Sequence, residues 1–337
     1  MTTYVIRRLL AIVPVLLGVS LVVFLGMKMV PGDVAEIMLG EKGSPEELAR
    51  LREQLGLNAP LYVQYWRFLR RAVTGNFGRS LRTRESALTE VALAFPTTIE
   101  LSVVALLVAV SIGIPAGVLA AVRPYSLFDN LTMVLVLIGV SMPVFWTALL
   151  LMLLGSLRLG WFPISGILSD GITLQRITGI HLLDALLTRN WVAGKDILAH
   201  LVLPAIALGT IPIAIIARMT RATMLEVLRQ EYITTARAKG LGSWAVIGRH
   251  AFKNALIPVV TVVGLQFGNL LSGAVLTETV FAFPGIGRLA VTSILYRDFP
   301  VVQALVLLSA TLFVLINLLV DLTYAYLDPR IRLTGAS

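Results

Sequence analysis

The polar residues whose spacing carries the most information lie in the basic segment 231–258, which is set between two long apolar runs. Good helix formers fill Ala236–Lys239, and the following Gly240 favours a left-handed cap at the end of a helix. Ser243 can then cap a second helix that runs from Trp244 toward Leu256. The small side chains of the first helix would let another protein's backbone approach closely. The segment therefore indicates either a docking surface for a partner protein or a basic loop that only sets membrane topology.

Motifs for catalysis are missing from the sequence. Gly194-Lys195 is the only Gly-Lys pair, and Arg189 stands where the first glycine of a phosphate-binding G-x-x-x-x-G-K-[ST] loop should be. The three histidines, His181, His200 and His250, lack metal-ligand spacing. We therefore expect no catalytic residue, no metal and no cofactor on this chain. Any ATP hydrolysis, with its Mg²⁺, must take place on other chains.

The composition predicts an integral membrane protein. The 337 residues are 57% hydrophobic and 14% charged, whereas a soluble domain has about 45–50% apolar and about 25% charged residues. The net charge of +9 is explained by basic cytoplasmic loops, so it gives no reason to expect nucleic acid as a partner. The absence of cysteine excludes disulfides but does not identify a compartment.

Six apolar runs are long enough to cross a bilayer, which takes about 20 residues each. They lie at Leu9–Val30, Ile99–Val122, Leu131–Leu157, Leu198–Ala217, Val259–Phe281 and Val301–Tyr324. Seven basic and two acidic residues lie in the connection 218–253, and Arg7 and Arg8 precede the first run. Because short cytoplasmic loops collect positive charge, we expect this connection and both termini to be cytoplasmic.

The segment between the first two runs is predicted to be a folded helical insertion on the extracytoplasmic side. Ser44-Pro45-Glu46-Glu47 has the pattern of a capping box, and Gly56 closes the helix that follows. A second amphipathic helix begins after Pro60, and Gly75–Ser80 is a turn-rich connector. We divide the chain into residues 1–95 (first span and insertion), 96–330 (five-span core with the loop 225–258) and 331–337 (cytoplasmic tail).

Glycine, proline and polar residues interrupt several spans. The third run contains Ser141-Met142-Pro143, and such breaks release backbone groups that need protein or water as partners. The fifth run carries Gln266, Asn269 and Ser272, which either join neighbouring helices or line a polar route.

Three acidic residues lie within or near the spans. Glu100 follows Thr97 at capping-box spacing and is expected to cap a helix. Glu278 either orders the turn after the fifth run or meets a substrate. Asp321, inside the sixth run, needs a basic partner or interfacial water, and we expect Arg218 or Arg221 as that partner.

Two of these segments resemble one known family. Residues 232–241, Y-I-T-T-A-R-A-K-G-L, and the following N-A-L-I-P of Asn254–Pro258 resemble the cytoplasmic coupling loop of ABC importer permeases of the dipeptide, oligopeptide and nickel group. Thr277–Arg288 resembles the signature that follows the fifth span in that group. Within the group, the chain is most similar to the first of the two dipeptide permease subunits. Of the wider family's Glu-Ala-Ala triplet, only Ala236 is kept, which is itself typical of the peptide group.

The resemblance implies an all-helical type I permease fold with six spans, in a bacterial inner membrane. It also implies a second homologous permease subunit, two cytoplasmic ATP-binding subunits and an extracytoplasmic substrate-binding protein. The ATPase-coupling residues would be Glu231, Tyr232, Thr235, Ala236, Arg237, Ala238, Lys239, Gly240 and Leu241. The residues expected to line the pathway are Gln266, Asn269, Ser272 and Glu278.

The alternatives are a secondary, ion-coupled transporter and a membrane scaffold without transport. Broken helices suit a secondary transporter, but such a protein would normally show internal repeats and has no use for a docking loop. A scaffold would not need glycine and proline breaks in several spans. The solute stays open among dipeptides, oligopeptides, nickel, haem and glutathione.

Overall fold

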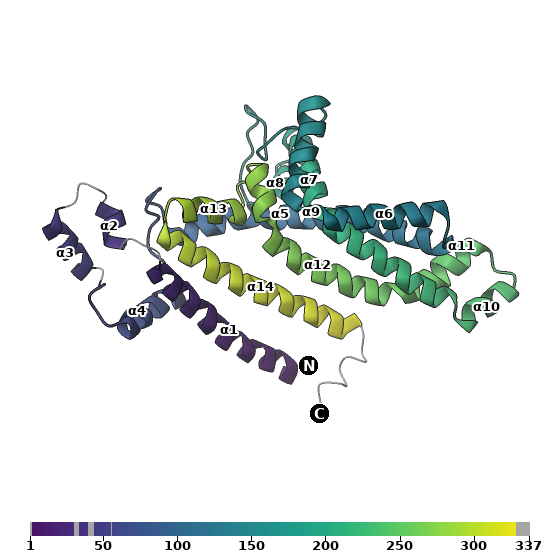
Figure 1. Cartoon of the computed structure of the whole chain (residues 1–337), viewed down its shortest axis with the longest axis horizontal. Coiled ribbons are helices and arrows are strands. Elements are labelled where there is room, and N and C mark those ends of the chain that lie inside the picture. The colour runs from purple at the N-terminus through teal and green to yellow at the C-terminus, as the bar shows by residue number, and fades with distance from the viewer. Residues whose placement is uncertain (1, 30–33, 40–43, 55, 328–337) are drawn as a thin grey trace. The chain divides into compact units, whose positions relative to one another are not determined.

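A computed structural model describes residues 2–29, 34–39, 44–54 and 56–327 of the chain (Figure 1). These residues form helices and connecting loops, with a single isolated bridge between Arg79 and Ser86 in place of any strand in the described part. The described residues divide into two compact units. The first comprises those of Met1–Phe95 and Arg288–Leu318, and the second those of Pro96–Gly287 and Leu319–Ser337.

The first unit begins with α1 (Thr2–Met29), which is followed by the short helices α2 (Val34–Leu39), α3 (Pro45–Gln54) and α4 (Leu61–Val73). The predicted capping box is confirmed. The Ser44 amide donates to the Glu47 carboxylate at 2.9 Å, and the Glu47 amide donates to Ser44 Oγ at 3.2 Å. Gly56 follows α3 with a φ of +67°, as expected for a residue that closes a helix.

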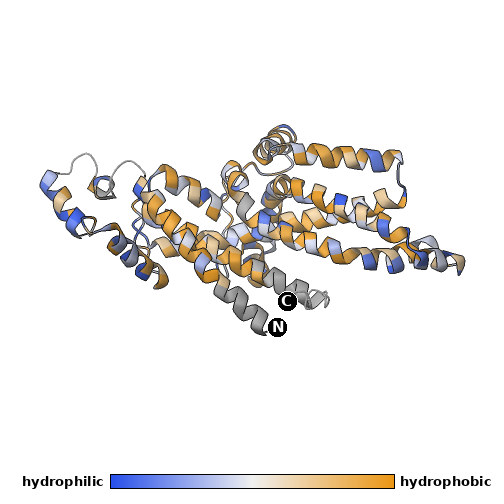
Figure 2. Ribbon diagram, turned by 60° about the horizontal axis from the view of Figure 1, so that its bottom comes forward, coloured by the Kyte–Doolittle hydropathy of each residue, from blue (hydrophilic) through white to orange (hydrophobic). Residues whose placement is uncertain are grey.

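Aromatic side chains attach α4 to α1. The ring of Phe24 lies 5.4 Å from that of Tyr65 and 5.9 Å from that of Phe68, measured between centroids. Tyr65 also shares a hydrogen bond of 2.9 Å with Ser20. Hydrophilic residues are frequent on α3, whereas the coloured part of α1 is largely hydrophobic (Figure 2). The insertion is therefore helical, as predicted, and its helix α4 is in contact with the first span.

The buried carboxylate of Asp298 holds the connector that follows α4. It accepts hydrogen bonds from Ser80 Oγ at 2.5 Å and from the Leu81 amide at 3.1 Å. Asp298 lies between α13 (Ile286–Leu295) and α14 (Phe299–Leu327). The connector is thus fixed to the start of the last long helix of the unit.

The second unit is built around α9 (Trp191–Leu228), which is the most buried of the long helices. It packs against α12 (Lys253–Val280), α6 (Leu127–Ser141), α7 (Val144–Leu151) and α8 (His181–Leu187). The long helix α5 (Ala87–Val122) runs from the first unit into this one. Ile197, Leu201 and Leu208 of α9 belong to a core of mostly aliphatic and alanine side chains.

Glycines allow α5 and α9 to approach closely. A Cβ atom on Gly117 would lie 2.5 Å from the Ala217 carbonyl oxygen, and one on Gly113 would lie 2.9 Å from that of Ile213. Both distances are shorter than any normal contact. The glycines of the second span therefore face a neighbouring helix.

The third predicted span is not one helix. It consists of α6 and a second segment, α7 followed by the π-helical turn Met152–Arg158, and the two are bent by 106°. Met142 is extended with ψ near 131°, as the residue before a proline prefers, and Pro143 precedes α7. Five described helices are long and apolar enough to span a membrane, or six if the bent pair counts as one span.

Candidate functional site

The short helix α10 (Glu231–Ala238) has one face on the core of its own chain and another in solvent. Ile233 and Ala236 are buried in a cluster with Met224 of α9 and with Val246 and Ala251. The remaining residues of the predicted coupling set are exposed: Glu231, Tyr232, Thr235, Arg237, Ala238, Lys239, Gly240 and Leu241. The helix is therefore held from inside while polar and small side chains face outward.

Gly240 ends this helix with a left-handed turn. Its φ is +79°, a region that residues with a Cβ rarely adopt. The Gly240 amide donates to the Arg237 carbonyl at 2.9 Å, and the Leu241 amide donates to the Ala236 carbonyl at 3.4 Å. This pair of bonds is the Schellman pattern of helix termination. The prediction of a positive φ at Gly240 is confirmed.

The return helix begins at its predicted cap, Ser243, one residue earlier than predicted. Gly242 is the extended residue before the helix, with ψ near 147°, and Ser243 is the first helical residue, with no capping bond from its side chain. The prediction that Ser243 caps this helix is wrong, because Gly242 takes the extended conformation that a cap requires. The helix continues through α11 (Ser243–Ala245) and the π-helical Val246–Phe252 into α12. Asn254 donates to the Tyr232 hydroxyl at 2.9 Å, which ties α10 to its return helix.

The four predicted pathway residues do not form one group. Along α12, Gln266 and Glu278 are buried within this chain, whereas Asn269 is exposed. The side chain of Ser272 lies outside the described residues. Contact of these residues with a substrate stays a prediction.

Glu278 orders the turn that joins α12 to α13. Its carboxylate accepts hydrogen bonds from Thr98 Oγ1 at 2.6 Å and from the Gly287 amide at 2.8 Å, and Thr98 Oγ1 also accepts one from the Ile286 amide. A Cβ atom on Gly285 would lie 2.3 Å from this carboxyl group. The glycines of the turn therefore leave room for the carboxylate, which matches the structural role considered for Glu278.

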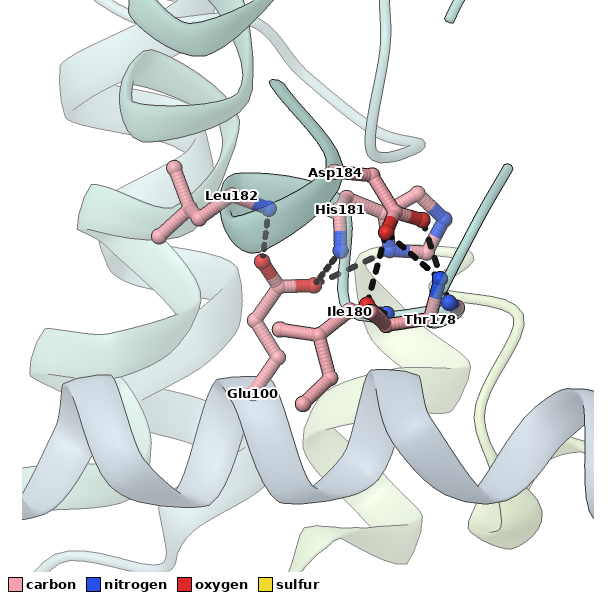
Figure 3. Close-up of polar contacts among 7 residues, drawn as sticks. Glu100, Thr178, Ile180, His181, Leu182 and Asp184 are labelled. Carbon is pink, nitrogen blue, oxygen red and sulfur yellow. Dashed lines mark hydrogen bonds and ion pairs between the residues drawn. The ribbon is translucent and has the colours of Figure 1, made fainter. Parts of the chain in front are cut away.

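Glu100 caps a different helix from the one predicted. It lies inside α5 rather than at its start, so the prediction that it caps its own helix is wrong. The buried carboxylate instead accepts hydrogen bonds from the amides of His181 (3.1 Å) and Leu182 (2.6 Å), and it lies 2.9 Å from His181 Nδ1 (Figure 3). These amides belong to the first turn of α8, whose donors have no partner within the helix. Glu100 thus fixes the loop before α8 to the middle of α5.

An ion pair that the sequence does not predict joins α6 to α9. The guanidinium of Arg221 donates to both oxygens of the buried Asp129, at 2.5 Å from Nε and 2.6 Å from Nη2. The Tyr125 amide adds a third donor at 2.9 Å. Arg221 is one of the two candidate partners of Asp321, and its observed partner is Asp129. The side chain of Asp321 lies outside the described residues.

Comparison with known proteins identifies the family. Residues 113–333 match the family described as binding-protein-dependent transport system inner membrane component, and residues 1–102 match the N-terminal region of such components. The chain belongs to this family. It is 49% identical over 332 residues to the dipeptide transport system permease protein DppB of Alkalihalophilus pseudofirmus, covering 98% of this chain and 100% of that protein. It is 40% identical to the glutathione transport system permease protein GsiC of Escherichia coli K12, covering 98% and 99% respectively.

A solved structure with a similar fold is an inward-facing form of the MetNI methionine ABC transporter. The TM-score is 0.52 at 19% identity, and the match covers 69% of this chain and 93% of the other. At this identity the similarity concerns the fold alone. The permease is thus a multi-pass, all-helical transport subunit of an ABC importer and not an enzyme.

Three aspartates that are not predicted from the sequence hold parts of the permease together: Asp129, Asp184 and Asp196. A signal for Asp129 existed, because Ser126 and Asp129 have the spacing of a capping box, and the Asp129 amide does donate to Ser126 Oγ at 3.2 Å. Asp196 accepts from the amide and the hydroxyl of Ser169, both at 2.7 Å. No local sequence pattern predicts that contact, because Ser169 lies in a loop 27 residues before Asp196.

Asp184 gives the permease a pH-dependent contribution to stability. Burial alone would raise the pKa of Asp184, but hydrogen bonds from the Thr178 hydroxyl and from backbone amides, including those of Thr178 and Gly179, outweigh it and hold the pKa below the ordinary value of 3.8. A carboxylate with a lowered folded-state pKa stabilises the fold above its unfolded pKa, and this contribution is lost as the pH falls through the folded pKa.

We therefore expect Asp184→Asn to lower the free energy of unfolding by about 1–2 kcal/mol at pH 7, because it removes a hydrogen-bonded carboxylate. The difference from wild type should shrink as the pH falls below about 3.8, where the carboxylate of the unfolded chain binds a proton, and should be lost below the lower pKa of the folded state. Denaturation of the detergent-purified permease at several pH values measures this. Asp170→Asn, at an exposed position of the loop that precedes α8, is the control and should have no effect. A difference that stays constant down to pH 3 would contradict the assignment.

Proposed function

We propose that this permease forms half of the membrane pathway of an importer for dipeptides or other small peptides. The observation that carries the proposal is its similarity, along nearly the whole chain, to permeases named for dipeptide transport. These include the protein of A. pseudofirmus and a di/tripeptide permease of Pseudomonas aeruginosa, which is 49% identical over 333 residues. The 40% identical relative is named for the transport of glutathione, which is also a short peptide. A peptide substrate is therefore favoured over nickel or haem.

The proposed assembly contains a second homologous permease, two cytoplasmic ATPases that bind ATP and Mg²⁺, and an extracytoplasmic substrate-binding protein. Membership in a family of binding-protein-dependent transport components supports such partners. The permease would lie in the inner membrane of a bacterium, with both termini and α10 in the cytoplasm, as the basic residues around α10 favour.

In this proposal, α10 transmits movement of an ATPase to the spans. Its outward residues, including Thr235, Arg237 and Lys239, would contact the ATPase, while Ile233 and Ala236 connect it to α9 and the return helix. An element that couples two states needs a rigid link to the part that moves. The Tyr232–Asn254 hydrogen bond and the buried cluster supply this link.

Uptake of a radiolabelled dipeptide in cells with and without the gene tests the substrate. We expect loss of uptake in the deletion strain and restoration by the wild-type gene together with its partner genes. Excess unlabelled dipeptide should compete, and excess nickel should not. Unchanged dipeptide uptake after deletion, or competition by nickel alone, would reject the peptide assignment.

Reporter fusions after Ser80 and after Gly242 test the orientation of the permease in the membrane. We expect an extracytoplasmic signal from the fusion after Ser80 and a cytoplasmic signal from the fusion after Gly242.

A further inference from the structure

The first unit contains a cavity of about 620 Å³ that the transport mechanism above does not use. It lies where the end of α1, helix α4, the connector 76–84 and the start of α14 meet. Phe24 and Met27 of α1, Phe68 of α4 and Phe299 of α14 supply apolar surface. The cavity therefore has walls from four segments, and an apolar molecule of moderate size would fit against them.

Basic side chains surround the same cavity. The cations that line it are Lys28, Arg67, Arg71, Arg79 and Arg84. None of the described lining residues is acidic, and none of these five side chains forms an ion pair with a carboxylate in the described part of the chain. Five like charges around one concave surface repel one another and raise the local concentration of anions. The cavity is thus suited to an anion that carries an apolar part.

The structure leaves space for one of these guanidinium groups and fixes the backbone that carries two others. A Cβ atom on Gly56 would lie 2.3 Å from Arg67 Nη1, so the glycine leaves the space that this guanidinium occupies. Arg79 and Arg84 flank the part of the connector that Asp298 fixes through Ser80 and the following amides. Guanidinium groups match phosphate geometry through paired hydrogen bonds. Several arginines around one cavity therefore favour a phosphate over a simple halide ion.

The position of the cavity at the end of α1 indicates the source of the anion. Lys28 is at the end of an apolar helix long enough to cross a bilayer, so the cavity opens at the level of an interface. The neighbouring side chains Val22, Leu25 and Met29 are apolar and exposed, as expected for a surface that contacts lipid. This reasoning holds for either orientation of the chain in the membrane.

We propose that this cavity binds the phosphate headgroup of an anionic phospholipid, with part of an acyl chain against its apolar wall. Arg71 and Arg79 contact the phosphate, and the rings of Phe68 and Phe299 contact the chain. The bound lipid joins the insertion to the first span and to the start of α14. The permease would then carry a structural lipid in its first unit, separate from the peptide pathway.

Native mass spectrometry of the full-length permease, titrated with phosphatidylglycerol or with phosphatidylcholine, tests the proposal. We expect at least one molecule of phosphatidylglycerol to bind about tenfold or more tightly than phosphatidylcholine. The double variant Arg71→Gln/Arg79→Gln should weaken this binding about 20-fold, since each basic residue near an anionic lipid contributes about fivefold. Arg70→Gln/Arg82→Gln removes the same charge from the same two segments outside the cavity and should leave the tight site intact.

A steric variant keeps the test independent of charge and of folding defects. Ala72 lines the cavity, and Ala72→Trp would fill part of it while all five cations remain. We expect Ala72→Trp to lose the tightly bound phosphatidylglycerol with an unchanged unfolding temperature. Equal affinity for the two lipids, equal losses in the two double variants, or displacement of the lipid by millimolar inorganic phosphate would overturn the proposal. Loss of substrate-binding-protein docking with lipid binding unchanged would assign the surface to a protein partner instead.

Discussion

Gly240→Asp is expected to lower peptide transport by about tenfold or more while the permease still inserts into the membrane. Gly240 has a φ of +79°, and nothing lies within 4 Å of the place that a Cβ would occupy. The aspartate side chain therefore fits. The left-handed conformation costs at most about 1–2 kcal/mol, because aspartate tolerates it better than most residues do. The larger effect comes from a carboxylate placed at the proposed contact with the ATPase, where an unpaired charge is costly to bury.

The measurements are dipeptide uptake and co-purification of the ATPase subunits. Gly240→Ala separates the two causes, since it adds the backbone strain without the charge, and we expect it to lower transport less than Gly240→Asp does. Arg249→Gln changes the charge of an exposed residue on the return helix and should transport normally. Normal transport by Gly240→Asp with its ATPases attached would show that α10 does not couple the two subunits.

This prediction rests on a feature that the sequence reveals by itself. Gly240 follows a run of helix formers, and a helix that ends at a glycine commonly does so in the left-handed conformation. The long helices α1, α5, α9, α12 and α14 were also predictable, because an apolar run of about 20 residues has few alternatives in a bilayer. In each of these cases the information lies within one segment of the chain.

Except for the cap at Ser243, the errors arose where the outcome depends on distant residues. Thr97 and Glu100 have capping-box spacing, but the helix already begins at Ala87, so the motif lies inside it and the carboxylate is available to α8. The break at Met142-Pro143 was visible, yet a proline alone does not specify a bend of 106°, which also depends on the packing of α6 and α7 against α9. The pairing of Asp129 with Arg221 spans 92 residues and has no local signature.

That pairing leads to the largest expected effect on stability. Asp129 is buried, with 1% of its side chain exposed, and its two oxygens accept from Arg221 and from the Tyr125 amide. Asp129→Asn would leave the Arg221 guanidinium without its counter-charge. The side-chain NH2 of the new asparagine is itself a donor and would face the donors of Arg221 and of the Tyr125 amide. Breaking a buried pair by removing one partner costs about 3–5 kcal/mol. Because 23% of the Arg221 side chain remains exposed to solvent, we expect a smaller loss of about 2–4 kcal/mol in the free energy of unfolding.

Denaturation of the purified permease measures this loss, and a double-mutant cycle assigns it to the pair. Asp129→Asn, Arg221→Gln and the double variant should give a coupling energy of about 1–3 kcal/mol, because residues in one hydrogen-bonded ion pair are not independent. Glu226→Gln removes an exposed carboxylate from the same helix as Arg221 and should change stability by less than about 0.5 kcal/mol. If the two single variants add without coupling, the contact does not hold α6 to α9. Arg221 would then be stabilised by another carboxylate, and Asp321 is the first to test by the same cycle.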